Sequence, residues 1–384
     1  MAREINTIKK GVYLIDSLTS GGAQRQLVEL VKGLDKKTVS PTVVAYHDIP
    51  FFRKELLDAD IPFSLIEKKD KLGISFFRQF LVALKRNPPD FIHSFLNVPN
   101  IYARVAKLFG GVKGVVTSDR NISLTQRFGL TLGEKMTWRL SDVIITNAHA
   151  VRDVLINRIG VPPSRIRVVY NGVQAERFSM ADREKVAEIR KRCRANKKGT
   201  LLIGLVGRVA PQKNHLALLV AMRRILDIRA DLDIRVGFCG AEADPIYAQK
   251  VRHAVSELRL NEKVFFLGVE KDMASVYQAC DVLVLPSLWE GFPNVVLEGM
   301  SARRPVIASD IVDNSQIILN GKDGFLVEPN NVESLAYVIL TVITLNEDER
   351  RAICERAWKK VVSEYSIDKM VQNTMQVYRE FGLC

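Results

Sequence analysis

The chain has 384 residues, 47% of them hydrophobic, which suffices for two buried cores because single cores stop growing beyond about 250 to 300 residues. Five cysteines without a CxxC pair indicate neither a zinc site nor a disulfide framework, and no apolar stretch approaches the roughly 20 residues of a membrane span. A net charge of +13 would suit nucleic acid, but no recognition helix, zinc finger or aromatic RNA-binding signature accompanies it, so no nucleic acid is expected.

The first half of the chain alternates strand and helix patterns. GVYLID (11–16) has the pattern of a buried strand, SLTSGG (17–22) that of a loop, and AQRQLVELVKGL (23–34) that of an amphipathic helix. Further strands are predicted at 41–46, 90–95, 114–118, 142–147 and 165–172, and a further helix at 74–87. This alternation predicts a parallel sheet with helices on both faces.

A charged segment with few large apolar residues, ADREKVAEIRKRCRANKKG (181–199), separates the two halves, and we place the domain junction there or just before it. The strand and helix alternation then restarts. Strands are predicted at 201–209, 233–240, 263–269, within 275–287, at 305–310 and at 324–329. We therefore predict an α/β protein with two doubly wound Rossmann-like domains, 1–180 and 200–365. The carboxyl ends of both sheets would face each other across a cleft, the usual ligand position for such sheets.

The basic charge belongs to the first half of the chain. Residues 1–199 hold 35 Lys and Arg against 19 Asp and Glu, whereas residues 200–384 hold 21 against 24. This is either a solvated basic surface or a surface that meets an anionic partner such as a phospholipid leaflet or a lipid diphosphate. The helix at 74–87 is expected to face the core, although Arg78, Lys85 and Arg86 leave a peripheral membrane role open.

SLWEGFPNVVLEGM (287–300) carries two carboxylates eight residues apart. Pro293 suits the first turn of a helix, which puts Glu290 in the preceding loop and Glu298 inside the helix. A helix N-terminus offers free N–H groups and partial positive charge, so the backbone of 291–294 would cradle a phosphate or a hydroxyl. Eight residues of helical rise span roughly 12 Å, unlike the ~5 Å pairing of a retaining glycosidase. The spacing suits the ribose and hexose of a nucleotide sugar.

A second motif, GLVGRVAPQKN (204–214), ends a predicted strand and precedes a predicted helix. It places Arg208 and Lys213 in the loop, where two cations could bind a diphosphate.

With these motifs the chain resembles the retaining glycosyltransferases of family 4, which have the GT-B architecture of two Rossmann-like domains. The resemblance runs from SGGAQRQ (20–26) through VVYNGV (168–173) to NGKDGFLVEP (320–329). The C-terminal stretch 366–384 resembles the last helix of the family, which crosses back onto the first domain.

The resemblance implies roles for individual residues. Arg208 and Lys213 would bind the donor diphosphate and offset charge on the departing nucleotide, and Glu290 would contact the donor sugar; these three are the expected catalytic residues. Glu298 would hold the ribose hydroxyls. The remaining donor-binding residues would be Gly21, Gly22, Gly291, Phe292, Pro293 and Asn294. No metal site is expected.

Two stretches depart from the family pattern. VVTSDRN (115–121) has Arg120 where many members have a histidine, and an arginine cannot act as a general base, although it could bind an acceptor phosphate. Arg120, Asn121 and His93 are the acceptor-side candidates, although a lone histidine such as His93 is more often structural. SDIVDNSQII (309–318) lacks the Gly-Gly pair and Glu of relatives, which leaves the donor sugar open.

The expected function is metal-independent transfer of a sugar, with retention of configuration, from a UDP-sugar rather than a GDP-sugar to a hydroxyl acceptor. The nucleotide sugar would be a co-substrate, with no further cofactor. The acceptor would be an anionic glycan or lipid-linked saccharide of polysaccharide or lipopolysaccharide assembly. The enzyme would be cytoplasmic, with a peripheral position on the inner face of the cytoplasmic membrane left open. The alternatives are a nucleotide-sugar 2-epimerase of similar architecture and a non-catalytic nucleotide-sugar-binding protein.

Overall fold

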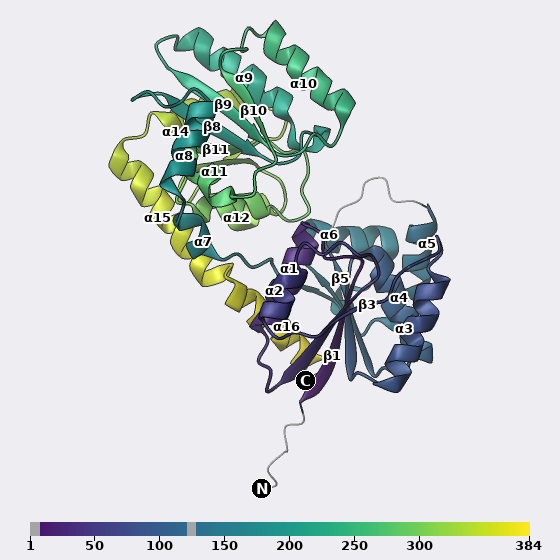
Figure 1. Ribbon diagram of the computed structural model, residues 1–384. Coiled ribbons are helices and arrows are strands. Elements are labelled where there is room, and N and C mark those ends of the chain that lie inside the picture. The colour runs from purple at the N-terminus through teal and green to yellow at the C-terminus, as the bar shows by residue number, and fades with distance from the viewer. Residues whose placement is uncertain (1–7, 121–127) are drawn as a thin grey trace. The chain divides into compact units, whose positions relative to one another are not determined.

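The computed structural model describes residues 8–120 and 128–384, which fold into two compact units (Figure 1). The first unit runs to Gly172 and includes the C-terminal residues Ile367–Cys384, and the second unit is Val173–Ser366. The division lies before residue 180, so the charged segment 181–199 belongs entirely to the second unit.

The described part of the first unit forms a seven-stranded sheet, in the order β3-β2-β1-β4-β5-β6-β7, with every neighbouring pair parallel. The carboxyl ends of parallel strands lie at one edge, so the residues that follow β4, β5 and β6 are neighbours there. The strands are β1 (Lys9–Ile15), β2 (Val39–Ala45), β3 (Phe63–Leu65), β4 (Phe91–Phe95), β5 (Gly114–Asp119), β6 (Val143–Thr146) and β7 (Ile166–Val168).

Helices cover both faces of this sheet (Figure 1). On one face α1, α2 and α16 pack around Tyr13, Leu27 and Tyr378, and on the other α3 and α4 pack around Leu14 and Phe76. The prediction that the helix at 74–87 faces the core is confirmed. The helices are α1 (Gly22–Gly33), α2 (Arg53–Asp58), α3 (Ile74–Arg86), α4 (Asn97–Phe109), α5 (Phe128–Thr137), α6 (His149–Val154) and α16 (Ile367–Glu380), with short turns at Trp138–Leu140, Leu155–Ile159 and Pro163–Arg165.

The second unit forms a six-stranded parallel sheet in the order β10-β9-β8-β11-β12-β13. Because β8, β11 and β12 are adjacent, the loops that follow their carboxyl ends lie side by side. The strands are β8 (Leu201–Val206), β9 (Ile234–Cys239), β10 (Val264–Gly268), β11 (Val282–Leu285), β12 (Val306–Ser309) and β13 (Phe325–Val327).

Helices again pack on both faces, with α9, α10 and α14 around one core and α8, α11, α12 and α15 on the other side of the sheet. The helices of this unit are α7 (Ala175–Ser179), α8 (Arg183–Arg192), α9 (His215–Ile228), α10 (Pro245–Glu257), α11 (Met273–Ala279), α12 (Asn294–Ser301), α13 (Asn314–Ile317), α14 (Val332–Ile343) and α15 (Glu347–Glu364), with a 3-10 turn at Pro211–Lys213.

The charged segment 181–199 holds helix α8, which is bound to the second unit by its arginines. Arg190 donates to the carbonyl oxygens of Ala279 and Thr200 at 2.7 and 2.9 Å, and to Asp281 Oδ2 at 3.0 Å. A lack of large apolar residues therefore does not mark a linker here, because guanidinium hydrogen bonds attach the helix instead.

Candidate functional site

The loop after β8 depends on two glycines. Gly207 and Gly240 have φ of 150° and 153°, a conformation that side chains rarely adopt. A Cβ on Gly240 would lie 2.1 Å from the carbonyl oxygen of Gly207, and a Cβ on Gly207 would lie 2.8 Å from Lys213 Cε. The loops after β8 and β9 can approach each other, and Lys213 can pack over its own loop, only because both positions lack a side chain.

Lys213 and Glu290 form a close ion pair, as Lys213 Nζ lies 2.5 Å from Glu290 Oε1. Their side chains are only 13% and 10% exposed. Gln212 donates from Nε2 to Glu290 Oε2 at 3.1 Å and to the carbonyl oxygen of Trp289 at 2.9 Å. Both carboxylate oxygens of Glu290 are therefore held, and two predicted site residues from different loops meet.

A pocket of about 140 Å³ lies beside this ion pair. Besides apolar side chains, it is lined by the expected residues Lys213, Glu290, Phe292, Pro293 and Asn294. The structure thus brings together in the second unit most of the residues that the two loop motifs singled out.

Sequence reasoning missed two polar residues of this pocket, Ser287 and Asn314. Both are buried, and neither Ser287 Oγ nor Asn314 Oδ1 has a hydrogen-bond partner among the described residues. Asn314 Nδ2 donates to the carbonyl oxygen of Ser309 at 2.8 Å, which fixes the side chain. The pocket therefore offers buried polar atoms to a polar ligand. The available signal was that 309–318 departs from the family pattern at a strand end.

Helix α12 begins at Asn294, with Pro293 at its N-cap rather than within its first turn. Glu290 lies in the loop and Glu298 in the helix, as predicted. Glu298 is half-buried and does not line the described pocket. Its Oε2 accepts a hydrogen bond of 2.5 Å from the hydroxyl of Tyr277, a fully buried residue of α11. Burial and the Glu298 carboxylate raise the pKa of Tyr277 well above its usual value. Tyr277 is thus a hydrogen-bond partner of Glu298 that the sequence did not reveal.

Arg208 and Gly291 flank these contacts. Arg208 is exposed in the loop between β8 and α9, and no hydrogen bond or ion pair joins it to another described residue. Gly291 is half-buried and lies in the chain between the pocket residues Glu290 and Phe292. Gly21 and Gly22 belong to the first unit, at the start of α1, so the pocket of the second unit forms without them.

The acceptor-side candidates lie in the first unit. His93 is fully buried, with Nδ1 2.6 Å from the Tyr378 hydroxyl and Nε2 2.8 Å from Ser118 Oγ. Burial, followed by the nearby Arg120 charge, holds the pKa of His93 well below its usual range. Because both ring nitrogens are occupied inside the core, His93 connects β4, β5 and α16 and does not face a ligand. Asn121 lies outside the described residues.

Arg120 follows β5 and is also buried, with its Nη1 2.7 Å from Asn171 Oδ1. Its guanidinium carbon lies 4.9 Å from the centre of the Phe95 ring. Among residues 8–120 and 128–384, no cluster of three or more His, Cys, Asp or Glu is arranged to hold a metal ion. In the same ranges, no helix has the length and hydrophobicity needed to cross a membrane.

Two family models match the chain, each over one part of it. Residues 20–177 match a model described as Glycosyltransferase Family 4, and residues 200–344 match one described as Glycosyl transferases group 1. The two matches together cover both loop motifs of the second unit and the glycine loop of the first.

Individual relatives extend the match. UDP-Gal:alpha-D-GlcNAc-diphosphoundecaprenol alpha-1,3-galactosyltransferase from Escherichia coli is 28% identical over 309 residues, which cover 77% of this chain and 76% of the relative. N-acetylgalactosamine-N,N'-diacetylbacillosaminyl-diphospho-undecaprenol 4-alpha-N-acetylgalactosaminyltransferase from Campylobacter jejuni is 24% identical over 389 residues, 96% of this chain and 98% of the relative. The crystal structure of HepE from Anabaena in complex with UDP is similar with a TM-score of 0.82 at 19% identity, covering 97% of this chain and 100% of that one. This last likeness shows the fold, which is GT-B.

Proposed function

We propose, because the chain belongs to glycosyltransferase family 4 (the group 1 glycosyltransferases), that it transfers a sugar from a UDP-sugar to a hydroxyl of a lipid-linked saccharide with retention of anomeric configuration. The observation that carries the proposal is the Lys213–Glu290 pair beside a pocket with unpartnered polar atoms. UDP is the nucleotide in the HepE complex and in the name of the Escherichia coli relative, which supports UDP over GDP.

Without ligand, Lys213 and Glu290 neutralise each other. In the proposed reaction the donor diphosphate replaces Glu290 as the partner of Lys213. The phosphate oxygens can do so because they accept strong charge-assisted hydrogen bonds from an ammonium group. Glu290 then keeps its bond from Gln212 and accepts hydrogen bonds from hydroxyls of the donor sugar. The Lys213–Glu290 ion pair thus holds both side chains in place when the pocket is empty. When the donor binds, the pair separates and each side chain binds a different part of the donor.

Breaking the bond between the sugar and the diphosphate sends the electron pair to the phosphate oxygen, and positive charge develops on the sugar. Lys213 and the exposed Arg208 would stabilise the departing UDP, and the N-terminus of α12 would add its partial positive charge. These groups supply the electrostatic stabilisation in the proposed mechanism, which uses neither a metal ion nor a further cofactor. Glu298, held by Tyr277, would bind the ribose hydroxyls.

The acceptor belongs to the proposal as well. The names of both curated relatives contain an undecaprenol diphosphate, which supports an acceptor of the lipid-linked class in polysaccharide or lipopolysaccharide assembly. The basic first half of this chain suits an anionic lipid surface, so we place the enzyme at the inner face of the cytoplasmic membrane as a peripheral protein. We expect nucleic acid to be neither a substrate nor a partner in this function. The 2-epimerase and binding-protein alternatives are not favoured.

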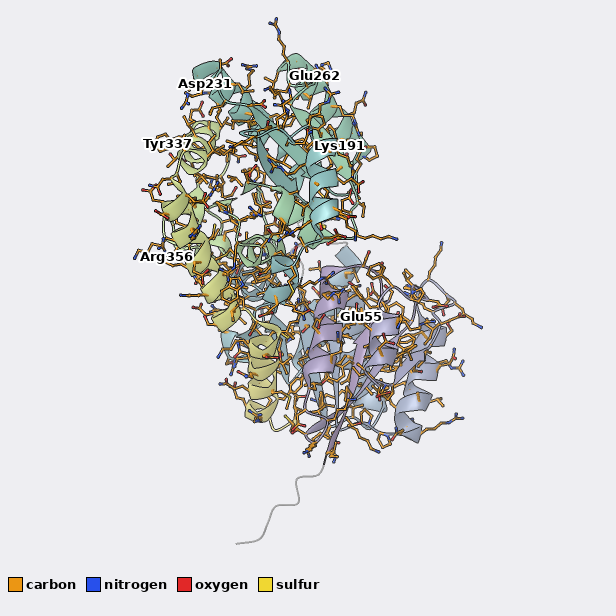
Figure 2. All side chains as sticks on the ribbon, turned by 60° about the vertical axis from the view of Figure 1, so that its left-hand side comes forward. Glu55, Lys191, Asp231, Glu262, Tyr337 and Arg356 are labelled. Carbon is orange, nitrogen blue, oxygen red and sulfur yellow. The ribbon has the colours of Figure 1, made fainter. Side chains whose placement is uncertain are left out.

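The test is UDP release from a panel of UDP- and GDP-sugars, with and without a bacterial membrane lipid extract. Lipid-dependent release from one UDP-sugar is expected, with at least a hundredfold loss in Lys213→Ala and Glu290→Gln. The matched control is Lys191→Ala, since Lys191 is an exposed lysine of α8 in the same unit (Figure 2). Release that ignores lipid, or that persists in Lys213→Ala, would contradict the proposal.

A further inference from the structure

A buried guanidinium without a counter-charge lies at the carboxyl end of β5 in the first unit. Arg120 is only 6% exposed, and its one hydrogen bond to a described residue is from Nη1 to Asn171 Oδ1. Nε is buried and has no hydrogen-bond partner within 8–120 and 128–384. No carboxylate of the described residues forms an ion pair with it.

The other deeply buried arginine of this unit shows what a structural arginine looks like. Arg104 is 1% exposed, with the Asp119 carboxylate 3.8 Å away. It also donates to Ser141 Oγ at 2.9 Å and to Thr117 Oγ1 at 3.1 Å. Burying a charge is costly unless it is paired and hydrogen-bonded, and Arg104 meets both conditions. Arg120 is hydrogen-bonded through Nη1 alone, and no carboxylate of the described residues pairs with it.

Arg120 nevertheless keeps its charge. Burial lowers the pKa of Arg120 to about 10, which still leaves the guanidinium protonated at neutral pH. The guanidinium carbon of Arg120 lies 4.9 Å from the centre of the Phe95 ring, and a cation over an aromatic face recovers only part of the lost hydration. The described residues of the first unit therefore hold a positive charge for which they supply no carboxylate partner.

The geometry of the free atoms indicates what the partner is. Nη1 is taken by Asn171, which leaves Nε and Nη2, the two groups on one edge of the guanidinium. Two parallel N–H donors on one edge match two oxygens of a phosphate or carboxylate.

The neighbouring strand end adds polar atoms. Asp119 pairs in register with Thr146, so Arg120 and Asn147 follow on adjacent strands. Thr146 Oγ1 and Asn147 Oδ1 are buried and have no partner among the described residues. The hydroxyl of Thr146 can donate to an anion, whereas Asn147 Oδ1 can only accept and would suit a hydroxyl of the ligand. Ligands of doubly wound sheets bind outside the carboxyl ends of the strands, where these residues lie.

We propose that Arg120, at the carboxyl ends of β5 and β6, binds a phosphate of the acceptor. The proposal rests on the proposed function, since the donor diphosphate is assigned to Lys213 and Arg208 of the second unit, which leaves the anion at Arg120 to the acceptor. Arg120 cannot accept a proton but can bind a diphosphate. Arg120 is thus a specificity-determining residue that selects phosphate-bearing acceptors.

The experiment uses the full chain saturated with UDP, which fills the donor site, and titrates inorganic pyrophosphate by calorimetry. Wild type is expected to bind one pyrophosphate, and Arg120→Gln is expected to weaken that binding about tenfold or more, the effect of losing a charge-assisted hydrogen bond. Arg120→Lys keeps the charge without the two-donor edge and is expected to lie between. Asn171→Ala removes the Nη1 partner but keeps the Nε and Nη2 edge of Arg120, and it is the control, expected within about threefold of wild type.

Stability separates binding from a structural role. If the charge of Arg120 awaits a ligand, Arg120→Met has an unchanged or higher melting temperature in the ligand-free state. A lower melting temperature together with unchanged pyrophosphate binding would overturn the proposal. So would equal binding of pyrophosphate by Arg120→Gln and wild type, or no binding by wild type. Titration with glucuronate distinguishes the sources of the anion, and tighter binding of glucuronate than of pyrophosphate would contradict a phosphate ligand.

The two proposals can fail separately. Pyrophosphate binding requires no sugar transfer, so it can be lost in Arg120→Gln even in a protein that releases no UDP. Conversely, lipid-dependent UDP release with an acceptor KM unchanged in Arg120→Gln would leave the proposed function intact and remove this assignment.

Discussion

Replacing Tyr277 by Phe removes a single hydroxyl and tests whether Glu298 is positioned by α11. The Tyr277 hydroxyl donates to Glu298 Oε2 at 2.5 Å, and the raised pKa of Tyr277 keeps it protonated across the neutral range. The ring centroid lies 5.7 Å from that of Phe178, a contact that phenylalanine preserves. The substitution therefore changes the hydrogen bond and little of the packing.

The structure sets the size of the effect. A hydrogen bond to a charged acceptor contributes about 1.5 to 3 kcal/mol, but Glu298 is half-buried, so water can replace part of it. We expect the free energy of unfolding to fall by about 1 kcal/mol. If Glu298 holds the ribose, its freer carboxylate should weaken UDP binding about three- to tenfold.

The assay compares UDP with 2′,3′-dideoxy-UDP by calorimetry in wild type, Tyr277→Phe and Glu298→Gln. Wild type should prefer UDP, Tyr277→Phe should show a smaller preference, and Glu298→Gln the smallest. The control is Tyr337→Phe, because Tyr337 of α14 is 73% exposed and projects from the second unit (Figure 2). A preference in Tyr277→Phe equal to that of wild type would refute the reasoning, since Tyr277 would then not position a ribose ligand.

Three further predictions concern the second unit. Gly240→Ala should lower the melting temperature and abolish UDP binding, because its Cβ would lie 2.1 Å from the Gly207 carbonyl oxygen, as a thermal scan with and without UDP would show. Lys213→Met should lower the free energy of unfolding in urea by about 3 kcal/mol, because it leaves Glu290 unpaired. Adding Glu290→Gln should restore most of this free energy, and a double variant as unstable as Lys213→Met would contradict the reasoning. Burial lowers the pKa of His215 to about 4, so its neutral form stabilises the fold above the unfolded pKa of 6.5. As pH falls from 6.5 to 4, the free energy of unfolding of wild type should fall by about 3 kcal/mol more than that of His215→Leu. Plots of this free energy against pH that run parallel for the two proteins would contradict the reasoning.

Periodicity predicted the fold well because strands of parallel sheets are buried and read as apolar runs. The runs at 11–16, 114–118 and 201–209 correspond to β1, β5 and β8, and the placement of Glu290 in a loop and Glu298 in a helix is confirmed. The edge strand β3 was missed, because its three residues, Phe63–Leu65, are too few to show a period.

Partners that meet only in the folded chain could not be read from the sequence. Tyr277 and Glu298 are 21 residues apart on different helices. Asn314 reaches the pocket from α13, which follows β12, whereas Ser287 follows the neighbouring strand β11. The junction was predicted at 181–199 or just before it, and the two units divide between Gly172 and Val173. Composition shows the charge of this segment but not that Arg190 donates to the carbonyl oxygens of Ala279 and Thr200. The burial of His93 likewise follows from α16, whose Tyr378 is 285 residues away in the chain.

The measurement that tests the account most directly is transfer of radiolabelled sugar from UDP-sugars into a lipid extract, with released UDP counted in the same samples. We expect label in the organic phase in a one-to-one ratio with UDP, and neither in Lys213→Ala, while Lys191→Ala behaves as wild type. Binding of the UDP-sugar by wild type with no labelled lipid and no released UDP would contradict the central claim, and would leave a nucleotide-sugar-binding protein.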